Sequence, residues 1–259
     1  MKPFVENCLA IVLLASSALF AQTRFNGTWE MKMDTLQFSG APEDYLFDKG
    51  TYHCESCVPQ VDVKTDGTDH KVNGHPYDTL AVRILDDHSI KFTMKKNGKT
   101  TFECVETVSP DDRTMTEEFT NTSEAETVIG KAGFTRVAKG PPGSHALSGK
   151  WNMLTVKNAT TAGTLTTYQS TAEGIKISDG AQTYEARFDG KDYPATADHH
   201  STVSLKLIDE FTLEETDKQD GKVLTVVRMV VSKDGKSLRV ESTDKQRGGT
   251  MTYTAEKRP

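Results

Sequence analysis

The chain has 259 residues, of which 26% are charged, and a formal net charge of −6. An acidic chain without a block of basic residues is a poor ligand for nucleic acid or for an anionic membrane surface, so neither partner is expected. The length suits one large domain or two small ones.

The first 21 residues are predicted to be a secretory signal peptide. Lys2 gives a positive start, residues 9–20 are uncharged and apolar, and Ala21 offers a small residue at a cleavage point. This apolar run is too short for a membrane-spanning helix, and the rest of the chain has no comparable run. The sequence therefore predicts a secreted or periplasmic protein without a membrane span.

The chain that follows repeats itself. The Asp-Gly turn at Asp66 matches the one at Asp189, an offset of 123 residues, and turn pairs further along keep that offset. Near the start of each copy, Trp29 matches Trp151 at an offset of 122. A shared offset across several turns indicates a duplicated unit of roughly 115 residues.

A segment rich in Pro and Gly, residues 140–145, separates the two copies. Pro and Gly stop a strand and suit a short connection, so we expect this segment to be a linker. The predicted domains are one barrel repeat at 25–139 and a second at 146–259, each forming a barrel of its own.

Both copies are predicted to consist of β-strands. Apolar and polar residues alternate at 80–84 and again at 203–207, which gives each strand one buried face and one wet face. Turn pairs recur between short runs of β-forming residues. The prediction is an all-β protein of two tandem antiparallel up-and-down β-barrels, with about eight to ten strands each.

The central hairpin of each copy is predicted to have a three-residue loop, with Gly98 and Gly221 at positive φ. This loop brings apolar residues opposite one another better than a two-residue loop does, and burial selects the register of a strand. The predicted pairs are Phe92 with Phe102, Ile90 with Cys104, Phe211 with Met229 and Leu213 with Val227.

A short motif resembles the calycin superfamily of lipocalins and fatty-acid-binding proteins. Residues 27–29 read Gly-x-Trp at the start of a strand, and Arg136 lies in the last strand of the first copy. The resemblance implies that Trp29 packs against Arg136 and plugs one end of a barrel, and that the barrel holds a small ligand. Trp151 matches the pattern, whereas the last strand of the second copy offers no Arg. Short motifs along the whole chain also resemble those of tandem-repeat exported bacterial proteins of unassigned function.

Three cysteines follow the signal peptide, and all belong to the first copy. Cys54 and Cys57 have the spacing of a local disulfide, of a redox pair or of half a zinc site. A bond from one of them to Cys104 is a further alternative. We expect one disulfide and one free thiol in an oxidising compartment, and no metal.

The copies differ in the polarity of one strand. Phe92 and Met94 in the first copy correspond to Glu215 and Asp217 in the second. If the side of the strand that carries these residues points inward, the second barrel contains a polar patch that the first lacks. The two carboxylates either reach water at the end of the hairpin, anchor the head group of a ligand, or form a catalytic pair.

The function predicted from these patterns is non-catalytic binding of a small apolar or amphipathic molecule, without a cofactor. A surface or assembly module with filled barrels is the alternative. An enzyme is a third hypothesis, for which Asp198 and His199 with the two carboxylates form the one cluster to inspect, and no catalytic residue is assigned. The candidate cavity residues are Ile90, Phe92, Met94, Phe102, Leu213, Glu215 and Asp217.

Overall fold

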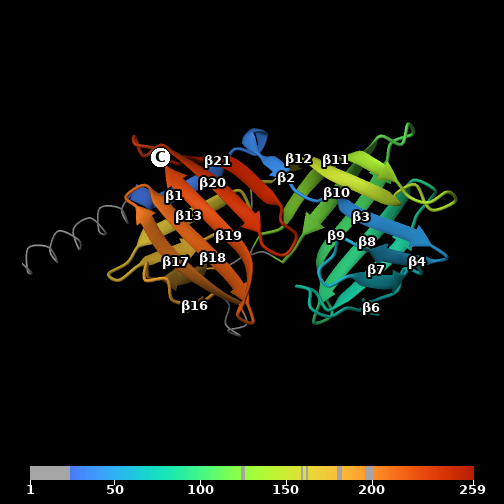
Figure 1. Cartoon of the computed structure of the whole chain (residues 1–259), viewed down its shortest axis with the longest axis horizontal. Coiled ribbons are helices and arrows are strands. Elements are labelled where there is room, and N and C mark those ends of the chain that lie inside the picture. The colour runs from blue at the N-terminus through green and yellow to red at the C-terminus, as the bar shows by residue number, and fades with distance from the viewer. Residues whose placement is uncertain (1–23, 124–125, 159, 162, 180–182, 196–200) are drawn as a thin grey trace, which may run out of the picture. The chain divides into compact units, whose positions relative to one another are not determined.

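The computed structural model describes residues 24–259 except 124–125, 159, 162, 180–182 and 196–200. It confirms an all-β protein with two nearly closed antiparallel barrels (Figure 1). The described part contains one short 3-10 helix, η1 (Met33–Thr35), and no helix in it is long and apolar enough to cross a membrane. The predicted signal peptide (1–21) and the Asp198-His199 cluster lie outside the described residues.

In the ten-stranded N-terminal barrel, strands that follow one another in the chain pair, except β5 and β6, and the last strand, β12, pairs with the first, β3. A bridge between Asp66 and Arg83 joins the remaining edges, just after β5 and within β7. The strands are β3 (Glu43–Asp48), β4 (Thr51–Cys54), β5 (Val61–Lys64), β6 (His70–Lys71), β7 (Thr79–Ile84), β8 (Ser89–Lys96), β9 (Lys99–Val108), β10 (Thr114–Asn121), β11 (Val128–Lys139) and β12 (Gly149–Asn158), with the short β2 (Gln37–Ser39) before them.

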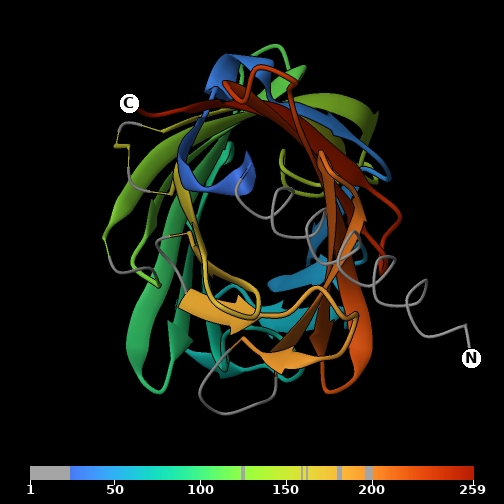
Figure 2. The ribbon, with the colours of Figure 1, turned by 90° about the vertical axis from the view of Figure 1, so that its left-hand side faces the viewer.

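The C-terminal barrel takes one strand from the other end of the chain. Strand β1 lies between β13 and β21 and pairs antiparallel with both. Figure 2 shows these strands, blue for β1 and yellow to red for the others, curving into a ring. They are β1 (Gly27–Met31), β13 (Leu165–Ser170), β14 (Ile175–Ser178), β15 (Thr183–Ala186), β16 (Tyr193–Pro194), β17 (Ser201–Asp209), β18 (Thr212–Gln219), β19 (Lys222–Val231), β20 (Ser237–Asp244) and β21 (Thr250–Lys257).

The compact units therefore differ from the predicted domains 25–139 and 146–259. One unit contains residues 36–163 and 246–249, and the other contains the described residues up to 35 with 164–245 and 250–259. The predicted linker is a hairpin loop inside the N-terminal barrel, since Lys139 pairs with Gly149 across it. Strand β12 therefore folds back on β11 and stays in the barrel of the first copy.

The two tryptophans predicted as plugs each lie in the core of the other copy's barrel. Trp29 and Trp151 are both buried, and each ring N–H donates to the carbonyl four residues earlier, at 2.7 Å to Phe25 and 2.9 Å to Leu147. The Arg136 guanidinium lies 3.9 Å from the centre of the Trp151 ring, so the predicted pair of Trp29 with Arg136 is wrong. The exchange of first strands is the reason.

A second contact is repeated at each plug, which shows that the two ends are built alike. The Phe47 N–H donates to Ser148 Oγ at 3.0 Å in the N-terminal barrel. The Ser170 N–H donates to Asn26 Oδ1 at 2.6 Å in the C-terminal barrel. The residue before each Gly-x-Trp motif thus caps a backbone N–H of the neighbouring strand. The cation over the Trp29 ring is Lys257, whose Nζ lies 5.2 Å from the ring centre.

The central hairpins differ from the predicted register by two residues. In the first, Lys96 pairs with Lys99, so Asn97 and Gly98 form a two-residue turn with φ of 51° and 75°. A bulge after Met94 then shifts the ladder by one residue, and the second copy repeats this arrangement. The observed pairs are Phe92 with Cys104, Ile90 with Glu106, Leu213 with Met229 and Glu215 with Val227.

A shift of two residues keeps every side chain on its predicted face, because side chains alternate along a strand. Ile90, Phe92 and Leu213 are accordingly buried in the barrel cores. The positive φ predicted for Gly98 and Gly221 is confirmed at 75° and 78°. The predicted register is wrong because it contains no bulge. Without a bulge, a two-residue turn would pair Phe92 with Glu103 and place a charged residue on the buried face.

The exchange of strands predicts which fragment folds alone. Residues 36–163 hold a complete ring with its own plug, so this fragment should give a dispersed amide NMR spectrum and a cooperative melting transition. Residues 146–259 lack β1 and Trp29 and carry an unpartnered β12, so this fragment should give neither.

A permuted fragment is the matched control for this pair. Residues 164–259 joined through a short Gly-Ser loop to 24–35 regain β1 beside β21, and this permutant should fold. Cooperative folding of 146–259 together with failure of 36–163 would contradict the exchange.

Candidate functional site

The predicted cavity residues line the inner faces of the two barrels. Ile90, Phe92 and Leu213 are fully buried in the cores, and Met94 and Phe102 are partly buried and pack against the core of the N-terminal barrel. Glu215 is 9% exposed, so it lies inside the C-terminal barrel and does not reach water at the end of the hairpin. The structure thus brings a carboxyl group into the barrel interior.

Glu215 is hydrogen-bonded to a tyrosine from another strand. The Tyr184 hydroxyl, on β15, donates to Glu215 Oε1 at 2.6 Å. Burial and the neighbouring Asp217 carboxyl raise the pKa of Glu215 to about 8. Burial also raises the pKa of Asp217 above its usual range. Glu215 therefore favours its protonated form at neutral pH.

Two further tyrosines border this cluster. Burial, with a contribution from Glu215, raises the pKa of Tyr253 to about 12. The Tyr168 hydroxyl lies 3.1 Å from the sulfur of Met229, deeper in the core. The interior is thus amphipathic: it contains hydroxyl and carboxyl groups together with apolar core residues such as Leu213.

The N-terminal barrel also contains carboxyl groups, which corrects the prediction that its interior is apolar. Glu106 on β9 and Glu117 on β10 are directly paired across the two strands. Glu106 is only 4% exposed, and burial, followed by the charges of Glu117 and Glu43, raises its pKa well above the usual value. Burial likewise raises the pKa of Glu117.

The sequence contained a signal for this cluster. Cys104, Glu106 and Val108 share one face of β9, and Met115, Glu117 and Phe119 share one face of β10. A charged residue in an alternating series of apolar residues points into the core. The prediction compared the copies on one strand only and missed the series on the next two.

Tyrosine side chains lie close to these carboxyl groups. Burial raises the pKa of Tyr45 and of Tyr52 well above the usual value, and for both the next contribution comes from Glu106. The Tyr52 ring packs against Phe47 and Phe92, with centroid distances of 4.9 and 5.3 Å. The N-terminal barrel therefore also combines a polar cluster with aromatic walls.

The carboxyl groups of the two barrels occupy different strands. At the offset of 123 residues, each buried acid corresponds to an apolar residue in the other copy. The corresponding residues are Phe92 and Glu215, Met94 and Asp217, Glu106 and Met229, and Glu117 and Val240. The copies share a scaffold and have different interiors, so we treat them as two sites.

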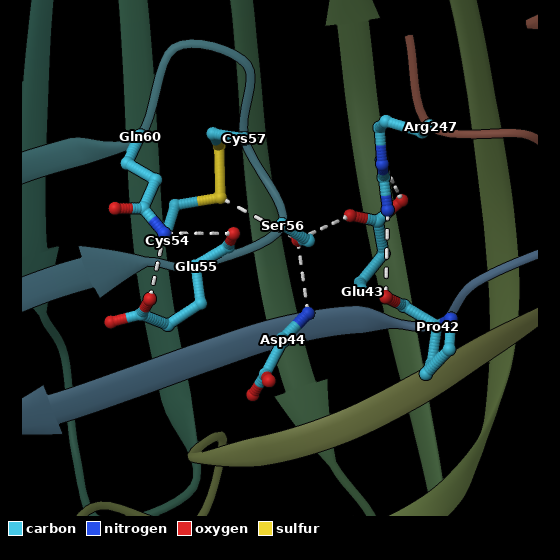
Figure 3. Close-up of a disulfide and its surroundings, with 9 residues drawn as sticks. All are labelled: Pro42, Glu43, Asp44, Cys54, Glu55, Ser56, Cys57, Gln60 and Arg247. Carbon is cyan, nitrogen blue, oxygen red and sulfur yellow. Dashed lines mark hydrogen bonds and ion pairs between the residues drawn. A yellow bond between two sulfur atoms is a disulfide. The ribbon is translucent and has the colours of Figure 1, made fainter. Parts of the chain in front are cut away.

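The disulfide joins Cys54 to Cys57, and Cys104 is free and buried, which decides among the predicted pairings. Figure 3 shows the bridge beside Ser56, which donates to Glu43 Oε2 and accepts from the Asp44 N–H, both at 3.0 Å. Arg247 pairs with the other oxygen of Glu43 at 2.9 Å. Burial raises the pKa of the Cys104 thiol well above its usual value.

Comparison with known proteins identifies no family. No model of a protein family matches the chain, and no curated protein matches it. Among solved structures, a double mutant of the vaccine antigen Transferrin Binding Protein B from Haemophilus parasuis Hp5 is similar, with 12% sequence identity and a TM-score of 0.21. The match covers 86% of this chain and 44% of that one, so this chain spans less than half its length. Similarity at this level supports no inference about function.

The raised pKa of Glu215 predicts how stability depends on pH. Between pH 4.5 and about 8 the folded state holds the proton that the unfolded state has released, so the free energy of unfolding falls as pH rises through this window. Glu215→Gln keeps an acceptor for Tyr184 and cannot ionise. The unfolding free energy of the variant minus that of the wild type should therefore be about 1–3 kcal/mol larger at pH 9 than at pH 5.

Thermal melts followed by circular dichroism across pH 5–9 measure the effect. Glu214→Gln is the control, because residue 214 lies on the outer face of the same strand and should leave the pH profile unchanged. Parallel profiles for the wild type and Glu215→Gln would contradict the buried, protonated carboxyl.

Proposed function

We propose that this protein is an exported, non-catalytic binding protein whose C-terminal barrel takes a small amphipathic molecule. The observation that carries the proposal is the Glu215–Tyr184 contact, a buried carboxyl and hydroxyl pair set in an apolar interior. Ligand sites commonly combine an apolar lining with a few convergent polar groups that fix orientation. The predicted signal peptide supports export.

The chemistry of the pair defines the ligand. A hydrocarbon alone would gain about 25 cal/mol per Å² buried, but it would offer no polar group to Glu215 and Asp217. A ligand with an apolar body and a cationic head satisfies both parts of the interior. Its charge favours the ionised carboxyl, so binding should release a proton.

The plugged end supports a lipocalin-like mode of binding. Trp29 is buried and its ring N–H donates to the Phe25 carbonyl, as a side chain that plugs a barrel end would, and a ligand would then enter from the other end. The resemblance to calycins rests on this plug and on the barrel architecture. The alternative is a surface or assembly module, in which both interiors are filled by side chains and no small molecule binds.

The proposal predicts selective binding of cationic amphiphiles. The full mature chain should bind a fluorescent alkylammonium probe more tightly than a fatty-acid analogue of equal chain length. Glu215→Gln should weaken binding of the cationic probe by about tenfold or more, because a charge-assisted contact is lost. Calorimetric titration at pH 8 in two buffers of different ionisation enthalpy should also reveal proton release.

Glu214→Gln is again the matched control and should bind both probes like the wild type. Native mass spectrometry of protein purified from its source provides an independent check, through a retained small molecule. Equal, weak binding of both probes that is insensitive to Glu215→Gln would overturn the proposal and favour the interaction module.

A further inference from the structure

The N-terminal barrel brings together three side chains of metal-binding type. Cys104 and Glu106 alternate on the inner face of β9, and Glu117 faces Glu106 from β10. One ligand atom from each, a sulfur and two carboxylate oxygens, lies within 4.8 Å of both others. Regular strand pairing fixes this arrangement, since it places all three on one inward face.

Glu106 gives a second, independent indication that something belongs in this cluster. The residue is 4% exposed, and within the described part of the chain its Oε2 atom is buried without a hydrogen-bond partner. Leaving a buried polar atom unpaired costs about 1–3 kcal/mol. A side chain aimed into a cluster of ligand atoms with a vacant acceptor is the arrangement expected of a metal ligand.

The sulfur is available for such a role. Cys54 and Cys57 are bonded to one another, so Cys104 keeps a free thiol. The C-terminal barrel has Val227, Met229 and Val240 at the three corresponding positions, so its equivalent face has none of these ligand groups. The cluster is therefore a property of the first copy.

We propose that Cys104, Glu106 and Glu117 bind one divalent transition-metal ion, of which Zn²⁺ fits the donor set best. A thiolate selects a softer ion than Mg²⁺ or Ca²⁺, which take oxygen ligands only. In a tetrahedral zinc site the ligand atoms lie about 3.3–3.8 Å apart, so ligand atoms that lie within 4.8 Å of one another need to close by at most about 1.5 Å. Three protein ligands leave a fourth position for water or another small ligand.

Cobalt provides a test that reports on the sulfur itself. Full-length mature protein, freed of metal by a chelator, is titrated with Co²⁺ and with Zn²⁺, with its disulfide intact. Because the cluster is buried, a second sample is unfolded in urea without reductant and refolded with the metal present. We expect one ion per chain, a near-ultraviolet thiolate-to-cobalt charge-transfer band, and displacement of Co²⁺ by Zn²⁺.

Three variants and a control make the test specific. Cys104→Ser should abolish the charge-transfer band, and Glu106→Gln and Glu117→Gln should each weaken binding or abolish it. Glu118→Gln, the neighbour of Glu117 on the outer face of the same strand, should bind like the wild type. Circular dichroism of every variant reports whether it is folded.

Two outcomes would overturn the proposal. One is the absence of stoichiometric metal after both direct titration and refolding. The other is metal that binds without a thiolate band and is unaffected by the variants, which would place it at surface histidines or carboxylates.

Discussion

Each barrel is closed by a first strand that belongs, in sequence, to the other copy of the repeat. Across the loop after β11, Lys139 pairs with Gly149, so β12 fills the gap between β11 and β3. Strand β1 is left to fill the equivalent gap between β13 and β21. The exchanged strands also carry the buried plugs Trp29 and Trp151, and truncating a buried Trp typically costs about 3–5 kcal/mol. The C-terminal barrel therefore depends on both ends of the chain, whereas the N-terminal barrel is contiguous.

This shared scaffold leaves the interiors free to differ. The strands that follow each plug align in sequence at a constant offset, yet the buried acids lie on β9 and β10 in one barrel and on β18 in the other. In the C-terminal barrel a tyrosine hydroxyl satisfies Glu215, which suits a head group that competes for that contact. In the N-terminal barrel Glu106 keeps a vacant oxygen beside a thiol. The two proposed ligands, an amphiphile and a metal ion, thus rest on two different polar clusters.

The sequence predicts the strands, the barrels and the inward faces, because these follow from alternation and from turn pairs. It does not predict which barrel takes β1, since a segment rich in Pro and Gly is compatible both with a linker between two barrels and with a loop inside one barrel. No sequence pattern indicates the bulge after Met94, so the predicted pairs in the central hairpin differ from the observed pairs by two residues. Glu106 and Glu117 were predictable in principle, because both interrupt alternating apolar series. The contact of Tyr184 with Glu215 was not, since it joins strands 31 residues apart in sequence.

Cross-linking of paired cysteines tests the exchange of first strands most directly. Thr28 pairs with Thr167, and their hydroxyl oxygens are 2.9 Å apart, so cysteines at both positions are close enough for a disulfide. If the first copy kept its own first strand, position 28 would instead face residue 44, the counterpart of 167 at the offset of 123. The account predicts that Thr28→Cys with Thr167→Cys forms a bridge, seen as one cross-linked peptide by mass spectrometry without reduction, and that Thr28→Cys with Asp44→Cys does not. A bridge between positions 28 and 44, with none between 28 and 167, would contradict it.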